Sequence, residues 1–272
     1  MDNVLLFLAV GAILAMVIGG IVFRKVQRNR AAKQAAQFAH DRNWRYVASD
    51  SSIVTSYPQL FPFYASGRST SQPGISFGGS SAGDAHDVLS LRSGEYSGQS
   101  FTYTYTSYDD DSEKSSSTKT HLWHIVGLEL PVPFPNLIVR RRRKLELPQA
   151  RLTKPVELSS ADLNALYSVH SEHHPAAFDM MTSEMVQWLL AEQFQSEMVM
   201  QDRRLYVFNK GRQKLENIDP MLAQLSGFLS RIPTEAWQKA QGEYPRPARV
   251  QMVQALDLGK ITDAYKDWRD SK

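Results

Sequence analysis

The hydrophobic pattern begins with one long apolar run. The segment Val4–Phe23 contains twenty residues and no charged side chain. At 1.5 Å per residue, a helix of this length spans about 30 Å, which matches the hydrocarbon core of a bilayer. A helix also satisfies its own backbone hydrogen bonds, so it can cross lipid. The pattern predicts a transmembrane anchor over residues 1–23.

Two alternatives to an anchor are a cleaved signal peptide and a buried helix of a soluble domain. A signal peptide has a basic N-terminal region, a shorter apolar core and a small-residue cleavage site. This chain starts with Met-Asp-Asn, and its basic residues follow the apolar run directly. The length of the run and its flanking charges therefore favour an uncleaved, single-pass anchor.

Basic side chains beside a membrane span remain on the cytoplasmic side. Near the apolar run they occur only after it, and they are Arg24, Lys25, Arg28, Arg30 and Lys33. We therefore expect an N-terminus outside the cell membrane and a cytoplasmic C-terminal domain. The same five side chains are candidates for contact with anionic lipid headgroups, each contributing roughly 1 kcal/mol near the surface.

Small residues recur every four positions in the apolar run, at Gly11, Ala15 and Gly19. This spacing places them on one face of a helix, where a second helix can approach closely. The face is a candidate for homo-oligomer formation through the anchor. Glycine and alanine are also common in membrane helices that do not associate.

Periodicity divides the remaining chain into three parts. Residues 24–43 predict a juxtamembrane basic helix with a narrow apolar stripe, and residues 44–245 predict a soluble domain. Residues 246–272 predict an amphipathic C-terminal tail that packs on the domain or contacts a partner or the membrane.

The first half of the domain predicts strands, because apolar and polar residues alternate at 101–106 and 122–130. Residues 87–92 and 137–141 predict neighbouring strands. Pro131, Pro133 and Pro135 are expected to interrupt the sheet between them, since proline cannot donate to a strand ladder.

The second half changes to a helical period. We expect a strand at 165–170, a helix beginning near Pro175, and a hairpin of 197–200 with 205–208 about Asp202 and Arg203. Asp219 is expected to cap a helix with a clean apolar stripe, and a short helix is expected at 234–241. Strands first and helices later indicate an α+β fold, with a mainly antiparallel sheet and packed helices after the transmembrane helix.

Composition and charge limit the classes of ligand and partner that the chain can bind. The chain has no cysteine, which excludes disulfides and thiolate metal sites. Its net charge is +3, but five basic residues flank the anchor. The rest of the chain is close to neutral, so the charge distribution argues against a nucleic-acid-binding domain. No phosphate-binding loop or dinucleotide fingerprint occurs, and we expect no cofactor.

Four motifs suggest chemistry, but none has the context that its chemistry requires. Residues 79–83 fit G-x-S-x-G, yet no strand-to-helix elbow is predicted there. His121 and His124 lie three residues apart on a strand and face opposite sides, so they cannot easily coordinate the same ion. A possible zinc set comprises His170, Glu172, His173 and His174. A possible calcium loop contains Asp109, Asp111 and Glu113.

Residues 140–144 form a run of five basic side chains. On a strand these side chains divide between both faces, so they do not form one broad patch. Three interpretations fit the run: a charged edge that resists aggregation, a contact with anionic lipid, or a contact with nucleic acid or another acidic partner.

Several stretches together carry a resemblance. The apolar N-terminus is followed by Trp44-x-Tyr46 with Asp50, Pro62-Phe63 with Gly67-Arg68, Phe101-x-Tyr103-x-Tyr105, the run from His124 to Pro131, Tyr167-Ser168-Val169, and Ile232-Pro233-x-x-x-Trp237. In this order they resemble a family of single-pass membrane proteins from high-GC Gram-positive bacteria that has no established activity. Family members show Phe-Asn where this chain has Leu163-Asn164. The resemblance implies architecture and membrane anchoring over nearly the whole chain.

The leading hypothesis is a binding or scaffolding module at the inner membrane face, with the bilayer and a protein as its partners. A membrane-tethered, hydrolase-like enzyme with a site assembled from distant residues is the first alternative. A structural envelope component that self-associates through the anchor is the second.

The anchor makes a direct prediction about fractionation. We expect the full chain to remain in the membrane pellet after alkaline carbonate extraction, because a helix buried in the hydrocarbon core is not released when charge contacts are broken. A chain lacking residues 1–23 should move to the supernatant. Protease added outside intact cells should leave the C-terminus uncut, and its digestion there would contradict the predicted orientation.

Overall fold

The computed structural model describes the N-terminal helix in part and most of the domain, namely residues 19–20, 22–23, 26–27, 29–56, 83–109, 117–142 and 154–245. The predicted anchor lies almost wholly outside these residues, as do the predicted tail over 246–272 and the loop over 57–82. Among the residues that are described, no helix is long and apolar enough to cross a membrane. Val22 and Phe23, at the end of the apolar run, are 55% and 63% exposed.

The domain is built on one antiparallel sheet, which confirms the α+β prediction. The sheet follows the order β1-β2-β3-β4-β6-β5, and β7 pairs with β4 outside this path. The strands are β1 (Arg45–Ser49), β2 (Asp84–Ser93), β3 (Tyr96–Asp109), β4 (Ser117–Arg141), β5 (Lys154–Val156), β6 (Tyr167–Ser171) and β7 (Glu197–Lys210).

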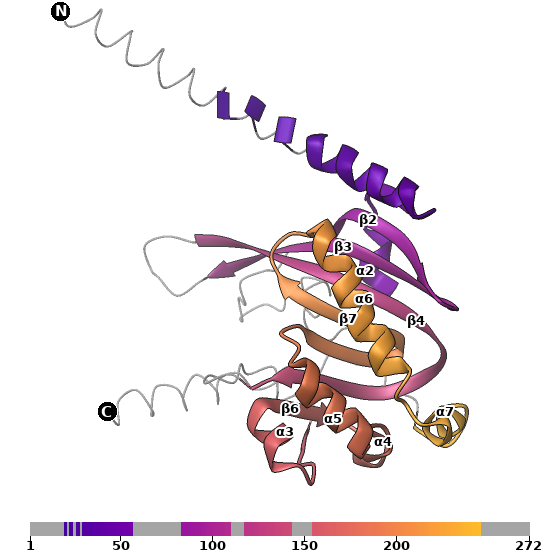
Figure 1. Ribbon diagram of the computed structural model, residues 1–272. Coiled ribbons are helices and arrows are strands. Elements are labelled where there is room, and N and C mark those ends of the chain that lie inside the picture. Colours follow the sequence, from indigo (N-terminus) through magenta and orange to yellow (C-terminus); the bar gives the residue numbers. More distant parts are fainter. Residues whose placement is uncertain are drawn as a thin grey trace, which may run out of the picture.

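Short helices surround the sheet (Figure 1). They are α2 (Ser52–Ser56), α3 (Ala161–Leu166), α4 (His174–Met180), α5 (Ser183–Glu192), the 3-10 turn η3 (Leu215–Asn217), α6 (Ile218–Leu229) and α7 (Thr234–Ala240). The helix over residues 29–41 lies at the end of the molecule that carries β2 and β3, while α3, α4 and α5 gather at the opposite end beside β6.

Strand β4 spans 25 residues and joins the two halves of the sheet. Its first half pairs with β3 and its second half pairs with β6, while β7 follows it along both halves. The prolines at 131, 133 and 135 therefore do not interrupt the sheet, and residues 137–141 continue β4. The register with β7 shifts between Glu129 and Phe134 and again before Leu137. Because these bulges suspend the regular ladder, the missing proline N–H groups are tolerated there.

The predicted hairpin about Asp202 and Arg203 is also wrong, because β7 runs through both residues as one strand. Asp202 has a φ of 52°, in the left-handed region, and it lies where the register with β4 shifts. The polar pair therefore marks a bulge rather than a turn. A bulge and a tight turn share the same local signal, and only the partner strand distinguishes them.

Three helix predictions need smaller corrections. Ala165 and Leu166 end α3 instead of starting the strand, which begins at Tyr167. The helical segment after Pro175 divides into α4 and α5, because the side chain of Thr182 caps a new helix by accepting from the Met185 N–H. Asp219 does not cap α6, since the cap position is Asn217.

The sheet buries an apolar layer on each face. On one face Val126, Leu128 and Leu205 pack in a cluster that includes the predicted stripe of α6, which is buried as expected. On the other face Phe101, Ile125 and Tyr206 belong to a second cluster. Adjacent strand residues alternate between these faces, so the register assigns each side chain to one of them.

The N-terminal helix is fastened to the domain where it ends. Ala35 and Ala39 are buried at 4% and 1% exposure. The Arg42 guanidinium lies 3.7 Å from the centroid of the Phe38 ring and forms a 3.0 Å ion pair with Asp219 of α6. These contacts orient the helix relative to the sheet.

A buried histidine on the α6 side of β4 predicts acid sensitivity. His124 is 2% exposed, its Nε2 lies 3.2 Å from Ser100 Oγ, and burial lowers its pKa from 6.5 to about 4. The unfolded chain takes up a proton near pH 6.5 and the native chain does so only near pH 4. Stability from this group is therefore complete above pH 6.5 and is lost as pH falls toward 4.

We expect the free energy of unfolding to fall by about 3 kcal/mol across this window because of His124. Urea denaturation of the full chain at several pH values measures it. The variant His124→Gln has no titrating ring, so its stability should depend less on pH. Equal pH slopes for the two proteins would contradict the assignment.

Candidate functional site: an arginine-lined groove

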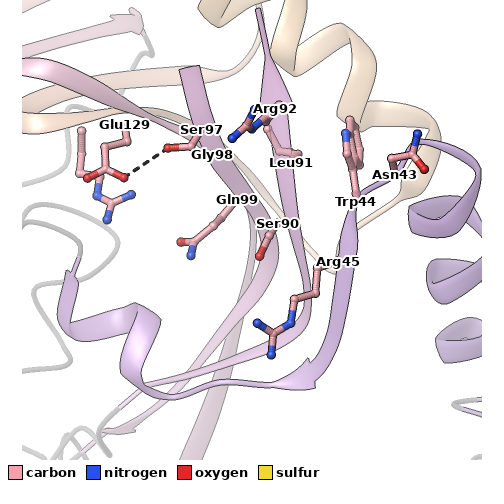
Figure 2. Close-up of a pocket in the computed structure, with 11 residues that line it drawn as sticks. Asn43, Trp44, Arg45, Ser90, Leu91, Arg92, Ser97, Gly98, Gln99 and Glu129 are labelled. Atoms are coloured by element: carbon pink, nitrogen blue, oxygen red, sulfur yellow. Dashed lines mark hydrogen bonds between the residues drawn. The ribbon is translucent and has the colours of Figure 1, made fainter. Parts of the chain in front are cut away.

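A groove of about 420 Å³ opens on the sheet beside the end of the N-terminal helix. We call it the arginine groove and define it by its polar side chains. One of them, Asn43, lies in the turn before β1. The others come from β1, β2, β3, β4 and β7, and they are Arg45, Ser90, Arg92, Ser97, Gln99, Glu129 and Arg204. Figure 2 shows Arg45, Ser90 and Gln99 reaching toward the same open space.

The sheet register places these side chains in two rows. In the first row Arg45 pairs with Ser90, Ser90 with Gln99, and Gln99 with Gly127. Gly127 has no side chain, so this face of the sheet stays open beside Gln99. In the second row Arg92 pairs with Ser97, and Glu129 pairs with Arg204. Both rows share the face of the second core cluster, because Gln99 lies two residues from Phe101.

Close packing of β3 on β4 supports the floor of the groove. A Cβ atom built on Gly98 would collide with the Gly127 carbonyl oxygen and would lie 2.7 Å from Leu128 Cδ2. Only glycine therefore fits at this position without displacing β4. The approach sets the distance between β3 and β4, which carry Gln99 and Glu129 of the groove.

The groove carries three guanidinium groups and one carboxylate, so its charge is positive. Arg45, Arg92 and Glu129 are exposed, and the Ser97 hydroxyl donates to Glu129 Oε2 at 3.4 Å. The Gln99 Oε1 atom is buried without a hydrogen-bond partner. Guanidinium groups bind carboxylates and phosphates through two parallel hydrogen bonds, so this arrangement suits an anionic group.

Two of the five membrane-surface candidates lie among the described residues. Arg30 and Lys33 are exposed on the N-terminal helix and do not line the groove. Arg24, Lys25 and Arg28 lie outside the described residues. Contact of these side chains with anionic lipid therefore stays a prediction.

The helix-association face is described only at its last residue. Gly11 and Ala15 lie outside the described residues, and a Cβ atom built on Gly19 has no neighbour within 4 Å. Self-association through this face also stays a prediction.

The histidine motifs separate in space. His121 stacks on Tyr105 with ring centroids 4.6 Å apart, on the face of the second cluster, whereas His124 faces α6. His173 caps α4, where its Nδ1 accepts from the Ala176 N–H at 3.2 Å. Within the described ranges, no group of three or more His, Asp or Glu side chains could hold a metal ion. Residues 79–82 and 110–116 of the other motifs lie outside those ranges.

Only the first two residues of the basic run at 140–144, Arg140 and Arg141, lie in a described strand. Arg140 Nε donates to Ser168 Oγ of β6 at 3.1 Å, and Arg141 ends β4. Lys144 and Arg143 lie outside the described residues. Of the described part of the run, Arg140, Arg141 and Arg142 do not line the arginine groove.

Sequence reasoning missed the arginine groove because its residues come from five strands. Arg45, Arg92 and Arg204 are isolated charges in the sequence, and each is typical of a solvated strand position. These residues meet only through the register of the strands. Hydrophobic alternation alone does not determine that register, so no signal in the sequence groups them.

Comparison with known proteins gives little further identification. No family model and no curated protein matches the chain, so the family resemblance stays a prediction. One solved structure that is similar is the mycobacterial trehalose monomycolate transport factor A, TtfA. The match has a TM-score of 0.46 and 11% sequence identity, and it covers 74% of this chain and 96% of that chain. At this TM-score the likeness carries no conclusion about activity or ligand.

Proposed function

We propose that the chain is a membrane-tethered binding module of the cytoplasmic face, whose arginine groove takes acidic side chains of a protein partner. The observation that carries this proposal is the convergence of Arg45, Arg92 and Arg204 around one open concavity with a single carboxylate, Glu129. The anchor and its orientation come from the sequence and belong to the same proposal.

The charge of the groove favours an acidic ligand. Arg45 and Arg92 are exposed, so a partner can reach them without displacing a described element. Glu129 lies opposite Arg204 across β4 and β7. Its negative charge therefore does not compensate the positive charges of Arg45 and Arg92. Complementary charge of this kind speeds association and selects partners by sign.

The distance from the membrane favours a protein over a lipid headgroup. If the span ends at Phe23, a helix over residues 24–41 adds about 27 Å when it runs along the membrane normal. The groove begins at Asn43, beyond that helix. Surface charges of the bilayer are screened within about 8 Å at physiological salt. A partner that reaches the groove is therefore more readily a protein.

The fastening of the N-terminal helix supports a fixed presentation of the groove. Arg42 joins Phe38 of the helix to Asp219 of α6, and Trp44 continues directly into β1. The helix axis and the groove are thus connected through one short junction. A tether built in this way restricts the groove to a limited range of orientations above the membrane, which raises its effective concentration for a membrane-bound partner.

The test compares two pairs of charge reversals in the full chain, by proximity labelling in the native membrane. Arg45→Glu with Arg92→Glu changes the groove, and Arg30→Glu with Lys33→Glu is a matched control on the helix. We expect the groove pair to weaken labelling of a protein neighbour about tenfold or more, because like charges placed opposite each other across an interface cost several kcal/mol. The helix pair should leave that labelling unchanged.

Thermal unfolding of both variants verifies that each still folds. If the groove pair keeps every neighbour, the proposal is wrong. If only the helix pair loses neighbours, headgroup attraction rather than the groove determines what the module contacts.

A further inference from the structure

A second cluster of polar side chains lies in the other half of the sheet, and it is buried. We call it the buried polar cluster. Its fully or nearly buried members come from three adjacent strands and are Asn136, Ser168, His170 and Gln201, with exposures of 0%, 6%, 4% and 4%. Arg140 lies beside them, partly exposed. None of these residues lines the arginine groove.

The register places the cluster on one face. Leu137 and Val139 of β4 face the first core, so Asn136 and Arg140 face the other side together with Ile138. Ile138 pairs with His170 of β6 and with Val199 of β7. Gln201 lies two residues beyond Val199 and therefore shares this face.

Polar atoms of Asn136, Gln201 and Arg140 lack partners. Both side-chain atoms of Asn136, the amide nitrogen Nδ2 and the oxygen Oδ1, are buried without a hydrogen bond. The same holds for Gln201 Oε1 and for Arg140 Nη2, although Arg140 Nε donates to Ser168 Oγ. Each buried polar group without a partner costs about 1–3 kcal/mol, and a leucine of similar size would avoid that cost.

The backbone holds Asn136 in place. Pro135 precedes it, and the register of β4 with β7 shifts between Phe134 and Leu137. The Ser171 hydroxyl donates to the Asn136 carbonyl oxygen at 2.7 Å. Bulges of this kind redirect side chains and occur next to binding sites more often than elsewhere in sheets. The Asn136 side chain is buried at a cost in stability, and its backbone is held in place. This combination implies a ligand that hydrogen-bonds to the side chain.

We propose that the buried polar cluster binds a small uncharged molecule with neighbouring hydroxyl groups. The cluster offers donors at Asn136 Nδ2 and Arg140 Nη2, and acceptors at Asn136 Oδ1 and Gln201 Oε1. A hydroxyl group both donates and accepts, so two adjacent hydroxyls match this mixed set. Two donors and two acceptors are thus available, and such a balanced set favours an uncharged ligand over an ion.

The experiment uses the full chain, purified from its native membrane in detergent, with D-glucose as the added probe. Native mass spectrometry should show a bound mass on the unmodified chain, and D-glucose should raise its melting temperature. In Asn136→Leu we expect affinity to fall about tenfold or more, because the variant removes a donor and an acceptor together. Gln201→Leu should also lower the affinity, and it replaces Asn136→Leu in the test if that variant fails to fold.

Gln238→Leu makes the same chemical change at an exposed position of α7 and controls for the general effect of sugars on stability. Partition of the released compound into organic solvent would identify a lipid headgroup, and retention in water would identify a free polyol. The proposal is overturned if no bound mass depends on Asn136 and D-glucose stabilises all four proteins equally. The cluster would then hold internal water only.

Discussion

The pairing of β4 with β7 is the interaction on which the rest of the structure depends. These two strands run beside each other through both halves of the sheet. One half adds β3, β2 and β1, and the other half adds β6 and β5. Bulges between Glu129 and Leu137 absorb the change of register between the halves. Such bulges increase the twist of a strand and bend it. The continuous pair of β4 and β7 can therefore belong to both halves of the sheet.

The two proposed sites follow from this division. The arginine groove occupies the half of the sheet beside the N-terminal helix, and its Arg45, Arg92 and Glu129 side chains are exposed. The buried polar cluster occupies the half beside β6, and its polar atoms are enclosed. One surface therefore suits a macromolecule recognised by charge, and the other suits a small molecule recognised by hydrogen bonds.

The sequence predicted the fold class and most elements because hydrophobic periodicity reports burial directly. The alternation of Phe101, Tyr103 and Tyr105 and the stripe of α6 both correspond to buried side chains. The errors fell at Pro133 and Asp202, where a bulge has the local signal of a break or a turn. The arginine groove could not be predicted, because Arg45, Arg92 and Arg204 converge only through long-range register.

Site-specific photo-crosslinking tests the central claim that the arginine groove contacts a protein partner of a membrane-tethered chain. A benzophenone side chain is placed at position 99, on the groove, and separately at position 33, on the exposed helix. The account predicts a protein adduct of defined mass from position 99 in native membranes, and no such adduct from position 33. Lipid adducts alone from position 99, or the same protein adduct from both positions, would contradict it.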